Sequence, residues 1–113
     1  MEFEIRFYEK ADGTKPAKEF LNELDKPMRI KMVKMISLLR ELGFNLREPY
    51  SKPIDDGIFE LRAQVGNNIS RILYFFVIGK KVVLTNGFIK KTQKTPQKEI
   101  ELAKKYRKDF LKQ

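Results

Sequence analysis

The sequence predicts an α+β fold in which helices pack against a largely antiparallel sheet. Two observations support this prediction. Helical patterns fill much of the first half of the chain, and three strand patterns separated by short turns follow one another in the second half. The chain has 113 residues, 42% of them hydrophobic, which is enough for one modest core. We therefore expect a single domain over residues 1–113.

The first predicted elements are a strand and a short helix. Polar and apolar residues alternate over residues 2–8, which is the pattern of a strand with one buried face. Asp12 and Gly13 then mark a turn. Thr14 follows this turn, and it predicts the N-cap of a helix that ends near Leu24.

A longer helix is predicted over residues 25–43. Asp25 is a favourable N-cap, Pro27 fits the first helical turn, and Gly43 fits the helix end. Methionines can line an adaptable binding groove, but on this helix we expect them to pack in the core. They belong to one apolar stripe with spacings of three and four residues, which consists of Met28, Met32, Met35, Leu39 and Leu42, with Ile36 beside it.

The second half of the chain is predicted to form a three-stranded antiparallel meander after a loop. Residues 44–56 contain two prolines and an Asp-Asp-Gly sequence, so we expect a loop there. Turns at residues 66–68 and 79–80 separate the apolar stretches that follow. The predicted strands are residues 58–65, 69–78 and 81–89.

A C-terminal helix is predicted after Pro96, because proline suits the start of a helix and Ile100, Ala103 and Phe110 recur on one side. The order of elements is therefore an N-terminal strand, two helices, the meander and a last helix. We expect the two early helices to cover one face of a four-stranded sheet.

The residue types that are missing exclude several kinds of site. The sequence contains no Cys and no His. Disulfide bonds and thiolate metal sites are therefore excluded, and the common zinc ligands are absent. We expect no metal and no other cofactor. No stretch approaches the roughly 20 apolar residues that cross a bilayer, and the first residues do not have the pattern of a signal peptide. We therefore expect a cytoplasmic protein without a membrane partner.

Positive charge is concentrated in the second half of the chain. The net charge is +9, and residues 61–98 contain eight Lys or Arg residues and no Asp or Glu. This asymmetry indicates a polyanionic partner such as a nucleic acid. A basic surface that only keeps the protein soluble is the alternative.

Arg71 is the most informative charged residue. It interrupts an apolar strand, where a charge is costly unless it is paired or opens onto a cleft. One interpretation is a salt bridge to Glu60 on the preceding strand, and the other is a guanidinium group held at a phosphate site. Arg62 lies beside Arg71 if the intervening turn pairs the two strands. It is then either a second anion ligand or an exposed surface residue.

Metal-independent RNA cleavage fits these cations. The 2′-OH attacks the adjacent phosphate, a base takes its proton, and cations stabilise the extra negative charge. The base is not evident, because no carboxylate lies between Leu61 and Lys98. A lysine with a lowered pKa can serve, as can the hydroxyl group of Tyr74, although a strand tyrosine is more often a core residue.

Lysines surround the predicted end of the last strand. Lys90, Lys91 and Lys94 lie where this strand leads into the C-terminal helix, whose first amides also attract anions. Runs of charge are usually just solvated, so their significance depends on convergence with the two arginines. We predict that the catalytic residues are Arg62, Arg71, Lys91 and Lys94, and that the RNA-binding residues are Lys80, Lys81, Lys90 and Lys98.

Several motifs in the second half of the chain occur together. They are Glu60-Leu61-Arg62, Gly66, Arg71-Ile72-Leu73-Tyr74, the block GFIKKTQKTP at residues 87–96, and Glu99-Ile100-Glu101-Leu102-Ala103. Together they resemble the phage-related HigB branch of the RelE-type toxins, and the element order is similar to the RelE-like toxin fold over the whole chain.

This resemblance implies the toxin component of a type II toxin–antitoxin system. Such a toxin is a ribosome-dependent mRNA endoribonuclease that inhibits translation, and a helix-turn-helix antitoxin holds it inactive. By position, Arg71 matches the strand arginine that contacts the scissile phosphate, and Arg62 matches a basic position on the preceding strand. The three lysines fall in the segment where relatives place catalytic basic residues. Many relatives use a C-terminal Tyr or a His as acid or base, and no equivalent is present here, because Tyr106 lies within the predicted helix.

Two other functions are compatible with the same fold. One is a ParE-like inhibitor of DNA gyrase, for which the basic residues would be incidental. The other is a catalytically inactive relative that only binds antitoxin or RNA.

Overall fold

The structure is a computed structural model, and it describes residues 2–89 and 94–113. The α+β class is confirmed. The described part of the chain forms strands, helices and one 3-10 turn in this order: β1 (Glu4–Phe7), α1 (Pro16–Glu23), α2 (Lys26–Leu42), η1 (Gly43–Asn45), β2 (Ser51–Asp55), β3 (Ile58–Val65), β4 (Asn68–Val77), β5 (Lys81–Ile89) and α3 (Gln97–Lys112).

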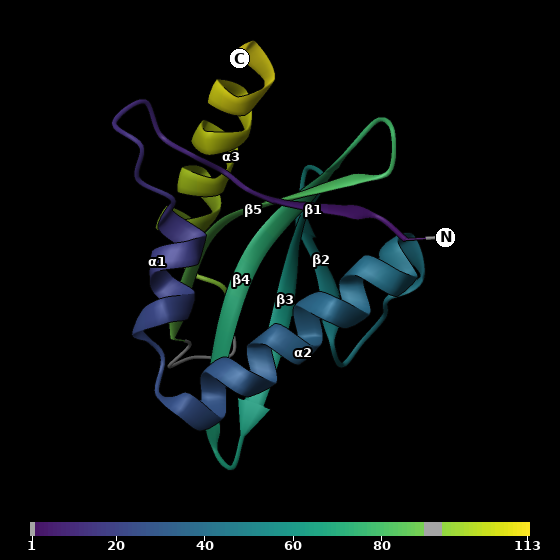
Figure 1. The fold of residues 1–113 in the computed structure, drawn as a ribbon, viewed down its shortest axis with the longest axis vertical. Coiled ribbons are helices and arrows are strands. Elements are labelled where there is room, and N and C mark those ends of the chain that lie inside the picture. The colour runs from purple at the N-terminus through teal and green to yellow at the C-terminus, as the bar shows by residue number, and fades with distance from the viewer. Residues whose placement is uncertain (1, 90–93) are drawn as a thin grey trace.

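One sheet organises the molecule. Its strand order among the described residues is β1-β5-β4-β3-β2. Strands β3, β4 and β5 form the predicted antiparallel meander, whereas β1 pairs with β5 in parallel. Figure 1 shows α2 crossing the near face of β3 and β4, with α1 on the same side.

The predicted loop over residues 44–56 is wrong at its end, because β2 lies there and the sheet has five strands instead of four. Strand β2 pairs antiparallel with β3, from Ser51 opposite Leu61 to Asp55 opposite Ile58. Pro53 is tolerated in β2 because this strand lies at the edge of the sheet, where a missing N–H group leaves no neighbour unpaired.

Of the two N-caps predicted for the early helices, Asp25 is right and Thr14 is wrong. Asp25 caps α2, since its side chain accepts a hydrogen bond from the Met28 amide at 2.9 Å. Thr14 does not cap α1, which begins at Pro16. The Thr14 amide instead donates to Asp12 Oδ1 at 2.9 Å, which closes a turn ahead of the helix.

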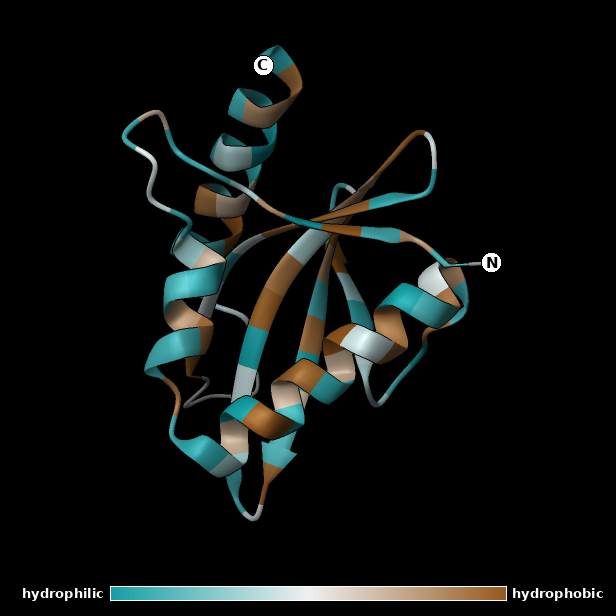
Figure 2. Cartoon of the chain, viewed as in Figure 1, coloured by the Kyte–Doolittle hydropathy of each residue, from teal (hydrophilic) through white to brown (hydrophobic). Residues whose placement is uncertain are grey.

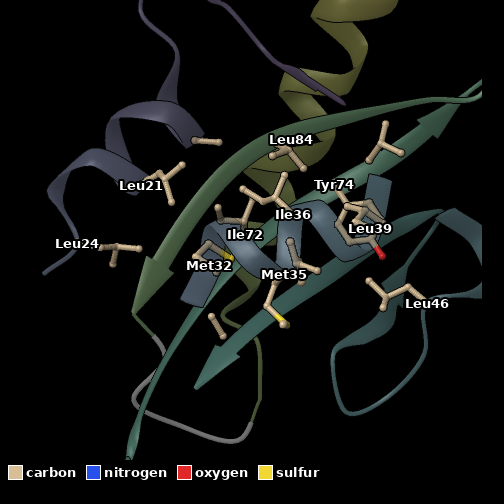
Figure 3. Packing of buried hydrophobic residues seen from close by; sticks show 14 of the residues in the cluster. Leu21, Leu24, Met32, Met35, Ile36, Leu39, Leu46, Ile72, Tyr74 and Leu84 are labelled. Carbon is tan, nitrogen blue, oxygen red and sulfur yellow. The ribbon is translucent and has the colours of Figure 1, made fainter. Parts of the chain in front are cut away.

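Apolar residues form a core on each face of the sheet. The larger core lies between the sheet and helices α1 and α2, where Met32, Ile36 and Ile72 pack together (Figure 3). The predicted stripe on α2 is buried except for Leu42, which is 41% exposed at the end of the helix. Figure 2 shows that β4 is mostly hydrophobic, with hydrophilic residues near its start.

The second core determines where the sheet remains open. Helix α3 packs through Ala103 against Ile58 and Leu73 on the opposite face of the sheet. Side chains alternate between the two faces of a strand, so Glu60 and Arg62 lie on the same face as Ile58, and Arg71 lies on the same face as Leu73. The α3 side of the sheet therefore carries both arginines next to the area that α3 covers.

Among the helices of residues 2–89 and 94–113, none combines the length and the apolar character that a membrane span requires.

Candidate functional site

Arg62 and Arg71 are directly opposite each other on adjacent strands. The register between β3 and β4 pairs Arg62 with Arg71, and the register between β4 and β5 pairs Arg71 with Phe88. Hydrogen-bonded strands hold both backbone positions rigidly. The expectation that the turn at residues 66–68 places Arg62 and Arg71 on neighbouring strands is therefore confirmed.

Glu60 connects the two arginines. Its side chain is 0% exposed, and Oε1 accepts hydrogen bonds from Arg71 Nη1 and, at 3.1 Å, from Arg62 Nε. Its second oxygen, Oε2, accepts a hydrogen bond from the Thr95 hydroxyl at 2.6 Å. The salt bridge considered for Arg71 is therefore present, and it occurs together with the pairing of the arginines.

A cleft of about 530 Å³ opens beside this network. It lies at the edge of β3 where pairing with β2 has ended, beyond Ser51 and Leu61. A single further hydrogen bond, from the Arg62 amide to the Tyr50 carbonyl at 2.9 Å, fixes the segment before β2. The cleft is lined by Lys31, Met35, Pro49, Tyr50, Arg62, Gln64, Gly66, Ile69 and Arg71.

The two arginines occupy different depths in the cleft. The side chain of Arg62 is 23% exposed, whereas that of Arg71 is 5% exposed. Arg71 Nε is buried, and no described atom accepts a hydrogen bond from it. Of the two arginines, Arg62 is therefore the one more accessible to an anion in the cleft, and Arg71 contributes positive charge from beneath.

Burial and the neighbouring charges together change the pKa values of Glu60 and Arg71. Burial alone would raise the pKa of Glu60, but hydrogen bonds from Thr95 and Arg62 and the charge of Arg71 outweigh it, and the pKa is lowered below its ordinary value. Burial also lowers the pKa of the Arg71 guanidinium, and the Glu60 charge partly offsets this effect. Arginine nevertheless remains protonated at neutral pH, so the network is ionised.

The lowered pKa of Glu60 predicts sensitivity to acid. A carboxyl group with a lower pKa in the folded state stabilises that state above its unfolded pKa of about 4.3. This stabilisation is lost as pH falls through the folded pKa. Urea unfolding measured from about pH 7 to about pH 3 should show that wild-type stability falls more steeply below about pH 4 than that of Glu60→Gln. Equal slopes would show that Glu60 is not held ionised by the fold.

Tyr74 is excluded as the base in this site. It lies in the core between the sheet and α2, on the face opposite the arginines, and it is 1% exposed. Its hydroxyl group is hydrogen-bonded to Ser51, and burial raises the pKa of Tyr74 to about 12. The signal that reveals this in the sequence is alternation along the strand, because Tyr74 lies three residues after Arg71 and therefore on the other face.

The predicted lysines are only partly brought together. Lys94, next to Thr95, and Lys98, in the first turn of α3, are exposed. Neither is among the described residues that line the cleft, and Lys94 lines a separate pocket with Thr95 and Lys52. Lys80 and Lys81 lie at the turn between β4 and β5, where Lys81 pairs with Val77, at the opposite end of these strands from Arg71. The structure does not bring these two residues to the cleft. Lys90 and Lys91 lie outside the described residues.

Sequence reasoning missed two features of the site. Tyr50 is 46% exposed and lines the cleft, but it was placed in a predicted loop and carries no distinctive motif of its own. Thr95 was recognised only as part of a basic block. Its role in the structure comes from its hydroxyl group, which is buried and donates a hydrogen bond to Glu60. Within residues 2–89 and 94–113 no three His, Cys, Asp or Glu side chains gather in a way that could hold a metal ion.

The chain is similar to a known protein family and to known proteins. Residues 19–108 match the family described as phage derived protein Gp49-like. The chain is also 38% identical over 85 residues to proteins named probable endoribonuclease HigB1 from two strains of Mycobacterium tuberculosis. Each of these alignments covers 74% of this chain and 67% of the relative. All residues that line the cleft, and Thr95, fall within the range matched by the family.

Proposed function

Since this chain belongs to the phage-derived Gp49-like family and is a HigB-like toxin, we propose that it is an endoribonuclease that cuts mRNA on the ribosome and so inhibits translation. The observation that carries the proposal is the pair of arginines opposite each other on β3 and β4, held by one buried carboxylate beside a cleft. Such a preorganised cationic pair fits a phosphodiester group.

The proposed reaction needs no metal. The 2′-oxygen forms a bond to the adjacent phosphorus, the bond from phosphorus to the 5′-oxygen breaks, and a 2′,3′-cyclic phosphate and a 5′-hydroxyl group result. Arg62 stabilises the negative charge of the phosphorane directly, and Arg71 stabilises it from the deeper position. One group must accept the 2′-OH proton and one must protonate the 5′-oxygen.

The lysines before α3 are the proposed proton carriers. Glu60 is buried with both oxygens engaged, and Tyr74 lies on the other face of the sheet. Lys94 is exposed next to Thr95, and Lys91 is close to it in sequence. We therefore keep Lys91 and Lys94 as the proposed catalytic residues of this segment.

The ring of Tyr50 is the proposed platform for a nucleobase. It is partly exposed on the wall of the cleft that contains both arginines, and its carbonyl group is tied to the Arg62 amide. A base can stack on this ring while the adjacent phosphate meets Arg62. Stacking on an aromatic side chain tolerates any base, so sequence preference would come from other groups, such as the Gln64 amide.

Tyr50→Ala should weaken binding of single-stranded RNA about tenfold or more, because stacking contributes roughly 1–3 kcal/mol per base. Tyr50→Phe should bind like wild type, since the ring is kept. Fluorescence anisotropy with a labelled 2′-O-methyl RNA, which cannot be cleaved, measures this affinity. A Phe variant as weak as the Ala variant would assign the effect to the hydroxyl group instead of the ring.

The proposed partners follow from the family and from the site. They are mRNA in the ribosome and a helix-turn-helix antitoxin, which we expect to cover the cleft or to displace α3. The protein would act in the cytoplasm, where its target is found.

The test is to add the purified protein to a bacterial translation extract and to map mRNA ends by primer extension. The proposal expects cuts within codons at the decoding site, and no cuts in the same mRNA without ribosomes. Cleavage of free mRNA at the same positions would contradict ribosome dependence. An absence of cuts in an extract that still translates would contradict the nuclease, and inhibition of DNA supercoiling by gyrase would then identify the ParE-like alternative.

A further inference from the structure

Glu60 has no chemical step in the proposed reaction, yet it contacts three of the site's side chains. Its carboxylate binds Arg62 on its own strand, Arg71 on β4 and Thr95 just before α3. We propose that Glu60 is a positioning residue: it holds the two arginine side chains and the start of α3 in fixed positions relative to one another. This inference rests on the proposed function, because the arrangement matters only if the arginines meet a phosphate.

Glu60 cannot itself exchange a proton with RNA in this structure. Its side chain is 0% exposed, and each carboxylate oxygen already accepts at least one hydrogen bond. A general base must come within hydrogen-bonding reach of the 2′-OH. Glu60 therefore acts through its neighbours.

The arginines need a common acceptor to stay together. Two guanidinium groups on opposed positions of adjacent strands repel each other, and arginine side chains have many rotamers. Glu60 Oε1 accepts hydrogen bonds from both side chains, so it offsets the repulsion and restricts their rotamers. Fixed donors at the reacting phosphate are what electrostatic stabilisation of a transition state requires.

Thr95 extends this arrangement to the last part of the chain. Its side chain is buried, and its hydroxyl group donates to Glu60 Oε2 across a separation of 35 residues in sequence. Thr95 follows Lys94 and precedes Pro96, the N-cap of α3. The hydrogen bond therefore fixes Thr95, and with it the adjacent Lys94 and the start of α3, relative to the arginines on the sheet.

Thr95→Val tests this link with a small change, because it replaces only the hydroxyl group by a methyl group. Thr85→Val is the matched control: Thr85 is also buried, and its hydroxyl group donates to the Leu73 carbonyl at 3.1 Å within the sheet. Both variants lose a buried hydrogen bond, but only one loses a bond to Glu60. Thr95→Ser keeps the hydroxyl group and should restore wild-type behaviour.

The first readout is the cleavage rate on programmed ribosomes at saturating toxin, well below the unfolding temperature of each variant. We expect Thr95→Val to reduce this rate about tenfold, as for loss of a hydrogen bond to a charged group, and to change affinity for the 2′-O-methyl RNA less than about twofold. Thr85→Val should keep the wild-type rate. Equal losses in the two valine variants, or no loss in Thr95→Val, would overturn the proposal.

The second readout does not depend on activity. In an NMR spectrum, the Nε–H resonance of Arg62 reports its hydrogen bond to Glu60. The Nε–H resonance of Arg71, whose hydrogen bond to Glu60 is made by Nη1, reports the order and the surroundings of that side chain. Thr95→Val should shift both resonances, and Thr85→Val should leave them in place. If the wild-type protein cuts no RNA, the proposed function fails, and the NMR comparison still decides about Glu60. Unchanged arginine resonances in Thr95→Val would overturn the positioning role.

Discussion

Arg62→Ala is expected to lower the rate of RNA cleavage about a hundredfold or more, the effect of removing one preorganised donor to a transition state. Arg62 is the more exposed of the two paired arginines that line the cleft. The protein should stay folded, because Glu60 keeps its contacts with Arg71 and Thr95. Single-turnover cleavage on programmed ribosomes measures the rate, and urea unfolding measures the stability.

Arg40→Ala is a suitable control for the loss of charge. Arg40 is exposed on the last turn of α2 and does not line the cleft. Its removal lowers the net charge by the same amount as removal of Arg62, so a general electrostatic effect on ribosome binding would appear in both variants. Similar rates for Arg62→Ala and Arg40→Ala would show that Arg62 has no role in catalysis.

Arg71→Ala is expected to destabilise the protein by about 3 kcal/mol or more, because it leaves the fully buried Glu60 carboxylate without its most buried counter-ion. Differential scanning calorimetry and urea unfolding measure the effect. Loss of activity in this variant alone would not separate catalysis from folding.

A double variant separates the two effects. Glu60→Leu combined with Arg71→Met replaces the buried ion pair by apolar side chains of similar volume, which is often neutral or stabilising. We expect the double variant to recover most of the stability lost in Arg71→Ala and to remain inactive. If it were as active as wild type, neither charge would take part in the reaction. If it were less stable than Arg71→Ala, the pair would owe its stability to contacts other than the buried charges.

The central part of the site could be predicted from the sequence because its geometry is local. The turn at residues 66–68 is short, and a short turn fixes the register of the strands on both sides. That register places Arg62 opposite Arg71. The unusual position of Arg71 within an apolar strand also pointed to Glu60 as its partner, which the structure confirms.

Other features depend on contacts between distant segments. Strand β2 is short, contains Pro53 and lies at an edge, so its sequence has the turn-rich composition of a loop. Tyr50 lies at the cleft beside β3, where its carbonyl group accepts a hydrogen bond from the amide of Arg62, a residue twelve positions away in the sequence. Lys80 and Lys81 were grouped with the site by charge alone, and charge carries no information about which end of a strand a residue occupies.

The parallel pairing of β1 with β5 has a consequence for the timing of folding. Strand β1 leaves the ribosome first, but its hydrogen-bonding partner lies at residues 81–84. Pairing across so large a sequence separation is slow, and it cannot begin before β5 has been synthesised. The contact between Thr95 and Glu60 and the packing of Ala103 come later still. A growing chain therefore lacks the complete network around Glu60 until Thr95 and α3 have been synthesised, so the ribosome has passed all five strands before the arginine site is assembled.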